Sequence, residues 1–353
     1  MKKLILIITA VFFIFSAVVF ADEYTEIDGE DFYNQTAGDI QKGTLSLNPA
    51  EIVQNTVNRL FAEVGECRKE IINLLVIAAL SGILQILKSS DGKKEVSETA
   101  FFACFTLMTM SALKIFTSAV GCGAEVIDNI CGFVTKLVPV FAALLVSGGA
   151  AASASAFHPV MSAAIYIMTI LVDKCIVPMV YFSAVLGIIG HITPGLKISS
   201  LTNLIRSAAK WLLTASLTVF TGVTAIYGFS APVFDAVAMK GIKFAVGTFV
   251  PVVGGILSET VDTVLSSTKL MKSAVGTAGI ISLVSICALP VIKILAIYIM
   301  LKLSQAAAEP ISDKRMADML GEIASSVSLI LGMVITAATL FIICIAIMLG
   351  ATN

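Results

Sequence analysis

The sequence predicts an all-α fold: a polytopic transmembrane helical bundle with an N-terminal signal peptide and an internal duplication. Hydrophobic residues make up 58% of the 353 residues and mean hydropathy is +0.98, against roughly 45–50% apolar residues in soluble domains. Charged residues make up only 13% and separate apolar runs long enough to cross a hydrocarbon core of about 30 Å. The expected partner is therefore the lipid bilayer, and a net charge of −1 gives no reason to expect nucleic acid.

The N-terminal part of the chain predicts export. Lys2 and Lys3 precede an uncharged stretch that ends at Ala21, which is typical of a signal peptide over residues 1–21. An uncleaved anchor is the alternative. Positions 22–70 carry eleven acidic and four basic side chains, and an arm of that charge is expected outside the cytoplasm, with an amphipathic helix near its end.

Two transmembrane helices are expected within positions 71–120. The first span is Ile71–Leu87, and the lysines that follow it favour a cytoplasmic loop. The second span is Phe101–Val120, and it is expected to end in an outside loop that holds Glu125 and Asp128.

An internal repeat is expected to follow, with halves at 121–230 and 231–353. Leu-Val-Pro-Val at 137–140 returns as Phe-Val-Pro-Val at 249–252, and Cys-Ile-Val-Pro at 175–178 returns as Cys-Ala-Leu-Pro at 287–290, with the same offset in both cases. Chance recurrence in a biased composition is the competing explanation. The prolines that define the repeat are Pro139, Pro178, Pro251 and Pro290.

Each predicted half contains a short proline-bearing apolar segment, a long span broken by proline, an amphipathic linker and a last span. Two arrangements of the short segments, Phe133–Gly149 and Phe244–Leu257, stay open at this point. If they span the membrane, the halves are inverted and the chain has eight spans; if they are re-entrant, the halves are parallel and it has six. Counting Lys and Arg mildly favours the parallel arrangement.

Sequence motifs of catalysis are missing, so no enzyme, cofactor or metal site is expected. The two histidines, His158 and His191, are far apart in the sequence, and the chain has no zinc-helix, nucleophile-elbow or Walker A motif. Seven cysteines are present, and most lie in apolar runs where a thiol acts as a small hydrophobe. A disulfide between Cys122 and Cys131 is an open possibility, favoured only if their loop faces an oxidising space.

Two charged features are candidates for a conduit or for partner contacts. Asp173 and Lys174 stand within a long apolar span, where ionisable residues are costly unless paired or wetted; a helix break ahead of Pro178 is the simpler explanation. The second feature is a short interfacial or re-entrant helix expected after a proline-glycine turn. Its candidate residues are Pro251, Gly254, Gly255, Glu259, Asp262 and Lys269.

The block G-T-F-V-P-V-V-G-G-I-L-S-E-T-V-D-T-V-L-S-S at 247–267, followed by L-M-K-S-A-V-G at 270–276, resembles stage III sporulation protein AE. The resemblance implies a multi-pass protein of the mother-cell membrane around the forespore. It also implies partners among the membrane proteins of one sporulation operon and, through them, a forespore protein, in a channel or secretion-like complex. A stand-alone secondary transporter with two pseudo-symmetric halves is the alternative, and an intramembrane hydrolase rests only on the isolated Asp173 and Asp262.

Overall fold

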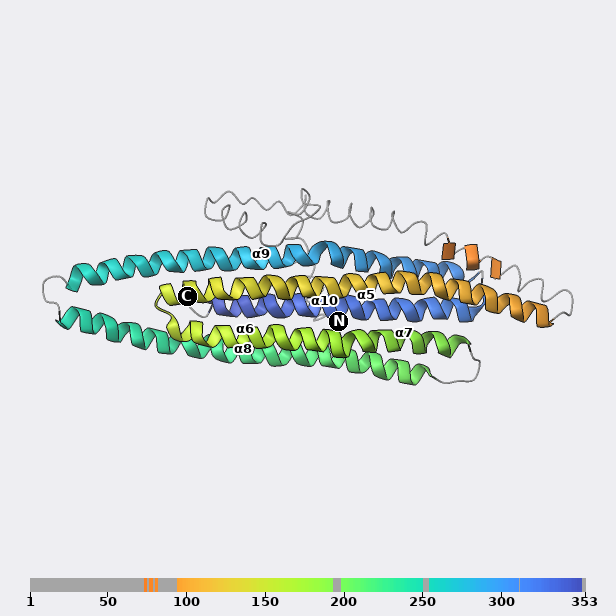
Figure 1. Cartoon of the computed structure of the whole chain (residues 1–353), viewed down its shortest axis with the longest axis horizontal. Coiled ribbons are helices and arrows are strands. Elements are labelled where there is room, and N and C mark those ends of the chain that lie inside the picture. Colours follow the sequence, from red (N-terminus) through yellow and green to blue (C-terminus); the bar gives the residue numbers. More distant parts are fainter. Residues whose placement is uncertain are drawn as a thin grey trace.

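The computed structural model describes residues 73–74, 76–78, 80–81, 94–192, 198–249, 254–310 and 312–350, and within these ranges every regular element is helical (Figure 1). The all-α prediction is therefore confirmed. The predicted signal peptide, the arm at 22–70 and Pro251 lie outside the described residues. The elements are α5 (Lys94–Ser147), α6 (Ala151–Ile170), the π-helix η2 (Leu171–Ile176), α7 (Val177–Ile192), α8 (Ser199–Phe249), α9 (Gly254–Ala308) and α10 (Lys314–Gly350).

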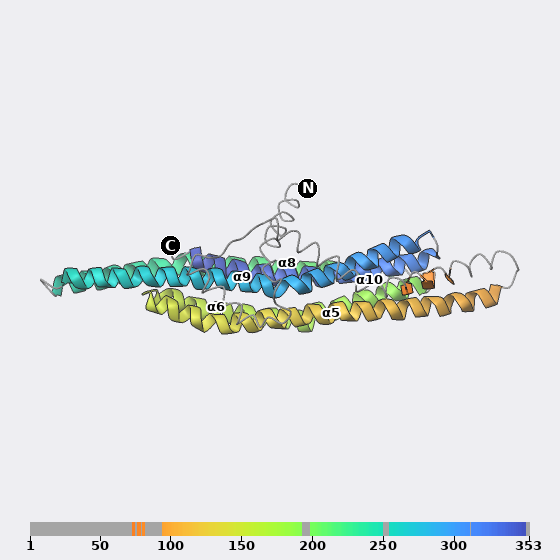
Figure 2. The ribbon, with the colours of Figure 1, turned by 90° about the horizontal axis from the view of Figure 1, so that it is seen from above.

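The helices run back and forth in one elongated bundle, and α6, η2 and α7 follow one another along a single line (Figures 1 and 2). Among the described residues, five helical segments are long and apolar enough to cross a membrane. The chain is thus a multi-pass membrane protein. These segments are Phe101–Ser147, Ala151–Ile192, Ser199–Gly241, Ser266–Ala308 and Lys314–Ile347.

Helix α10 lies at the centre of the bundle and contacts α5, α7, α8 and α9. Its sequence explains that position, because positions 323–350 carry no charge and the apolar side chains are spread around the whole helix. Small residues also let neighbouring backbones approach closely. At Gly276 of α9, for example, a Cβ atom would collide with the side chain of Leu349.

The outside loop predicted around Glu125 and Asp128 is wrong, because α5 continues through it without interruption. Both acidic side chains are exposed, whereas Val126, Ile127 and Ile130 beside them are buried. The charges therefore occupy the outer face of an amphipathic helix. The predicted boundaries at 120/121 and 230/231 consequently fall inside α5 and α8, and the division into repeat halves stays a prediction.

The first short proline-bearing segment is not a separate element, and the placement of the second segment in the membrane stays a prediction. Positions 133–147 form the last part of α5, and the second segment is shared between the end of α8 and the start of α9. The short interfacial helix expected over positions 258–272 is likewise wrong, because it is the first part of the 55-residue helix α9.

The helix break predicted near Asp173 and Lys174 is replaced by a change of helical register. The segment Leu171–Ile176 forms a π-helix immediately before Pro178, and the chain remains helical throughout. Proline has no N–H to donate to the carbonyl four residues earlier, here that of Lys174. A wider turn accommodates that missing hydrogen bond without ending the helix.

The helix directions bear on the predicted duplication. Elements at equivalent places in the two predicted halves run the same way along the bundle: α6–α7 with α9, and α8 with α10 (Figure 1). If the chain is duplicated, its halves are parallel and not inverted. Cys122 and Cys131 are separated by about 14 Å along the axis of α5, so a disulfide between them is excluded.

Candidate functional site

The residues singled out from sequence lie at separate places in the bundle. Pro139 lies within α5, Pro178 is the second residue of α7 and Pro290 lies within α9. Asp173 and Lys174 are exposed on η2. Exposed Lys269 is about 31 Å from Pro290 along α9, so these candidates do not form one site, and their roles stay predictions.

The candidates of the 247–267 block belong to a projection at one end of the bundle. Gly254, Gly255, Glu259 and Asp262 all lie in the first three turns of α9. We call positions 236–249 of α8 and 254–267 of α9 the tip. In Figure 1 the tip extends beyond the ends of α5, α6 and α10.

The base of the tip is fixed by Asp235 of α8. Its carboxylate accepts hydrogen bonds from the backbone N–H groups of Ala152 and Ser153 at 2.8 and 3.0 Å, and from the Ser153 hydroxyl at 2.5 Å. An acidic side chain at a helix N-terminus satisfies orphan amides and complements the helix dipole. Because α6 begins at this level, the part of α8 beyond Asp235 projects about 21 Å.

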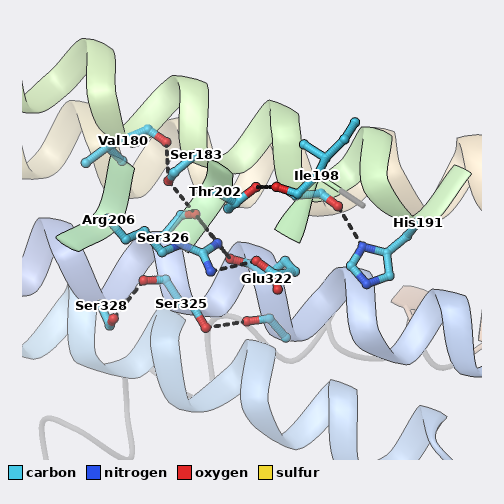
Figure 3. A network of polar contacts seen from close by, with 12 residues as sticks. Val180, Ser183, His191, Ile198, Thr202, Arg206, Glu322, Ser325, Ser326 and Ser328 are labelled. Atoms are coloured by element: carbon cyan, nitrogen blue, oxygen red, sulfur yellow. Dashed lines mark hydrogen bonds and ion pairs between the residues drawn. The ribbon is translucent and has the colours of Figure 1, made fainter. Parts of the chain in front are cut away.

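A buried ion pair joins α8 to α10 near the opposite end of the bundle (Figure 3). The guanidinium Nη1 of Arg206 lies 2.6 Å from Oε2 of Glu322, and the two side chains are 10% and 26% exposed. Nη2 of Arg206 donates to the backbone carbonyl of Glu322 at 2.8 Å and to the Ser326 hydroxyl at 3.1 Å. One arginine therefore holds two turns of the central helix.

Helix α7 completes this polar cluster. The hydroxyl groups of Ser183 and Ser326 lie 3.0 Å apart, and both residues are fully buried. Gly187, one turn further along α7, faces the acid: a Cβ atom there would lie 3.1 Å from the Cβ of Glu322 and 3.2 Å from Oε2. Because glycine has no side chain, the Glu322 carboxylate can occupy this space. We call Ser183, Gly187, Arg206, Glu322 and Ser326 the polar cluster.

The polar cluster links α7, α8 and α10 through one arginine, one glutamate and two serines. A buried ion pair loses much hydration energy and is retained where its hydrogen bonds are good. Nε of Arg206 is buried and has no hydrogen-bond partner among the described residues. His191 directs Nδ1 to the carbonyl oxygen of Gly187 at 2.6 Å, so that ring is held to its own helix. In the described ranges no three His, Cys, Asp or Glu side chains gather to hold a metal ion.

Local sequence patterns do not reveal the ion pair, because they place Arg206 in a polar linker and give no reason to single out Glu322. One signal is nevertheless present in the sequence. The two residues are 116 positions apart, which equals the offset between Pro194 and Pro310 at the starts of the two predicted linkers. The pair therefore joins positions that the predicted repeat would make equivalent.

Comparison with known proteins gives a match over nearly the whole chain. Residues 32–352 match the family model described as stage III sporulation protein AE. A Bacillus subtilis (strain 168) protein of that name is 31% identical over 311 residues, which cover 88% of this chain and 78% of that protein. No solved structure gives a significant match.

Proposed function

The chain belongs to the stage III sporulation protein AE family, and on that basis we propose that it is a membrane-embedded subunit of a channel or secretion-like complex. This complex connects the mother cell with the forespore during endospore formation. The protein resides in the mother-cell membrane around the forespore, and its partners are other membrane proteins of the complex and, through them, a forespore protein.

The tip is the observation that carries this proposal. It extends about 21 Å past the level of Asp235, beyond the end of α5 and the start of α6, so its surface has few neighbours among the described residues. Its apolar side chains are open, with Val237 67% and Phe244 74% exposed. Exposed large apolar side chains of this kind are typical of a contact site for another protein or for lipid. In a subunit, other members of the complex cover it.

Photo-crosslinking in sporulating cells tests the proposal. A photoreactive amino acid at Phe244 or Glu259 is expected to capture another membrane protein of the complex, whereas the same amino acid at Met110, 64% exposed near the opposite end, serves as the matched control. The tip variants must sporulate normally for the assay to count. Adducts from Met110 only, or from neither tip position, would refute a partner contact at the tip.

The stand-alone transporter remains a prediction from sequence and has a separate test. One cavity, lined by Leu145, Thr268 and Leu349 among others, has a volume of about 60 Å³. Ligand sites usually measure about 300–1,000 Å³. Purified chain in liposomes that moves small solutes on its own would favour the transporter over the subunit.

A further inference from the structure

Charged side chains lie at one level on the outer surface of the bundle, far from either end. We propose that this level marks one face of the bilayer, so that the hydrocarbon layer covers only the half of the bundle between it and Asp235. The other half, which holds the polar cluster, stands in water. The inference rests on the multi-pass membrane character of the chain and not on the channel. We call these residues the charge belt: Glu125, Asp128, Asp173, Lys174, Lys210 and Lys293.

Contacts between helices place α5, α9 and α10 in register at the charge belt. A Cβ atom at Gly123 of α5 would touch Ile330 and Met333 of α10 and would lie 3.8 Å from Ile294 of α9. Lys293 is the neighbour of Ile294, and Glu125 is half a turn from Gly123. Both charges therefore lie at the level of positions 330–335 of α10.

The remaining elements reach the same level. The Thr169 hydroxyl of α6 donates to the Cys131 sulfur of α5 at 3.7 Å, which puts Asp128 and Asp173, each about one turn away, side by side. On α8, Arg206 contacts Glu322 and Ser326 of α10, and further along Thr224 contacts Cys344 of α10 at 3.2 Å. Interpolation between these two contacts places Lys210 roughly opposite position 329 of α10. The charge belt thus spans about 11 Å along the axis.

Each charge-belt side chain is exposed, and α5, η2, α8 and α9 each contribute one or more. An outward-facing charge at the centre of a bilayer is costly, by roughly 2.5–3.5 kcal/mol even on insertion scales. Six of them around one level cannot all face hydrocarbon. Burial of the charge belt against protein would need a partner on every side of the bundle, whereas one water interface accommodates all six.

The distance from the charge belt to the base of the tip matches one hydrocarbon layer. Three helical intervals measure it: Asp128 on α5 to Gly148 directly after it, Ala152 to Asp173 on α6 and η2, and Lys272 to Lys293 on α9. At 1.5 Å per residue each interval is about 30–32 Å long, and a typical hydrocarbon core is about 30 Å thick. On α8, Lys210 to Asp235 gives about 37 Å.

The surface between the two levels is apolar. Positions 151–172, 211–234, 273–292 and 323–350 contain no Asp, Glu, Lys or Arg, and exposed residues there include Tyr166, Val219 and Ile226 at 60–67%. Lys136 of α5 is the exception; it lies about 12 Å from Asp128 and has an interaction partner in the structure. Trp211, 70% exposed, lies beside Lys210 at the charge belt, and tryptophan is enriched at membrane interfaces.

The distribution of basic residues indicates which half of the bundle lies on the cytoplasmic side of the membrane. The half beyond the charge belt holds six basic residues: Lys94, Lys114, Arg206, Lys302, Lys314 and Arg315. The tip end holds four, Lys240, Lys243, Lys269 and Lys272, so the positive-inside rule places the first half in the cytoplasm. The tip then projects from the outer face. The predicted second span, Phe101–Val120, falls in the cytoplasmic half, and the lipid-crossing part of α5 becomes positions 129–147. Phe102, Leu107 and Met110 in that half are also exposed and form an alternative surface for lipid. The experiment must therefore distinguish which half of the bundle the hydrocarbon layer covers.

Tryptophan quenching in vesicles measures the level directly. Trp211 is the single tryptophan, so a Trp211→Phe background accepts one new tryptophan at a time. Tyr166 and Phe182 form a matched pair: both are aromatic, they are 67% and 62% exposed, and they lie about two turns on either side of Asp173–Lys174 along one helical line. The full chain is reconstituted in phosphatidylcholine vesicles with or without lipids brominated in their acyl chains.

Brominated lipid is expected to quench Tyr166→Trp at least about threefold more strongly than Phe182→Trp, because the two sites lie about 12 Å on opposite sides of the interface. Native Trp211 should give an intermediate value. Equal quenching at the two sites would overturn the inference, since it would centre the hydrocarbon layer on the charge belt. Stronger quenching at Phe182 would overturn it as well and would move the layer to the half with Phe102. None of these outcomes depends on a partner at the tip.

Discussion

Replacing Arg206 by methionine removes a buried charge while nearly preserving side-chain volume. Glu322 then keeps its carboxylate without the guanidinium 2.6 Å away, and the carbonyl of Glu322 and the Ser326 hydroxyl each lose a donor. Breaking a fully buried pair costs about 3–5 kcal/mol. Because 26% of the Glu322 side chain is exposed, water recovers part of that loss, and we expect destabilisation of about 2–3 kcal/mol.

Replacing both charged residues distinguishes the loss of the ion pair from nonspecific destabilisation of the protein. The Arg206→Met, Glu322→Met double variant leaves no unpaired charge, so its unfolding free energy should fall within about 1 kcal/mol of wild type. Unfolding is followed by circular dichroism during SDS titration of micelle-bound protein. Lys210→Met, one turn along α8 and exposed, is the control and should change stability by less than about 0.5 kcal/mol. Additive losses in the double variant would refute a coupled pair.

Three further substitutions test close contacts by the same titration. Gly187→Val drives a side chain into the space of the carboxylate and should cost about 1–3 kcal/mol, whereas Gly222→Ala, with no atom within 4 Å of its new Cβ, should not destabilise. Asp235→Ala removes the carboxylate that caps the N-terminus of α6 and should cost about 1–2 kcal/mol. Asp235→Asn keeps one acceptor oxygen in place of two and should restore about half of that loss; equal losses in the two variants would contradict capping. Gly276→Ala collides with α10 and should destabilise by about 1–3 kcal/mol, unlike Gly332→Ala at an open position; equal effects would argue against the close approach.

Composition and apolar runs predicted the fold class, because lipid offers the backbone no hydrogen-bond partners and a long apolar run satisfies its own N–H and C=O groups as a helix. They did not predict where helices end. Glu125 and Asp128 suggested a loop because acids interrupt an apolar run, but residues three apart share one face of a helix, and that face is the outer one. A pattern of charges does not by itself distinguish a loop from an exposed helical stripe.

Local sequence patterns could not predict the polar cluster, for a different reason. Arg206 and Glu322 each look like ordinary polar residues near a helix start, and only the packing of α8 along α10 makes them partners. Gly187 likewise looks unremarkable in α7 until Glu322 is placed against it. Contacts between residues more than a hundred positions apart depend on the whole bundle and not on the neighbouring sequence.

The central position of α10 also sets an order of events during synthesis. The ribosome makes α10 after the helices that surround it, so those helices enter the membrane before the element they pack around exists. Arg206 leaves the ribosome 116 positions ahead of Glu322, a delay of about 6–23 s at roughly 5–20 residues per second. During that interval Arg206 has no Glu322 carboxylate to pair with, so the link between α8 and α10 can form only after α10 has been made.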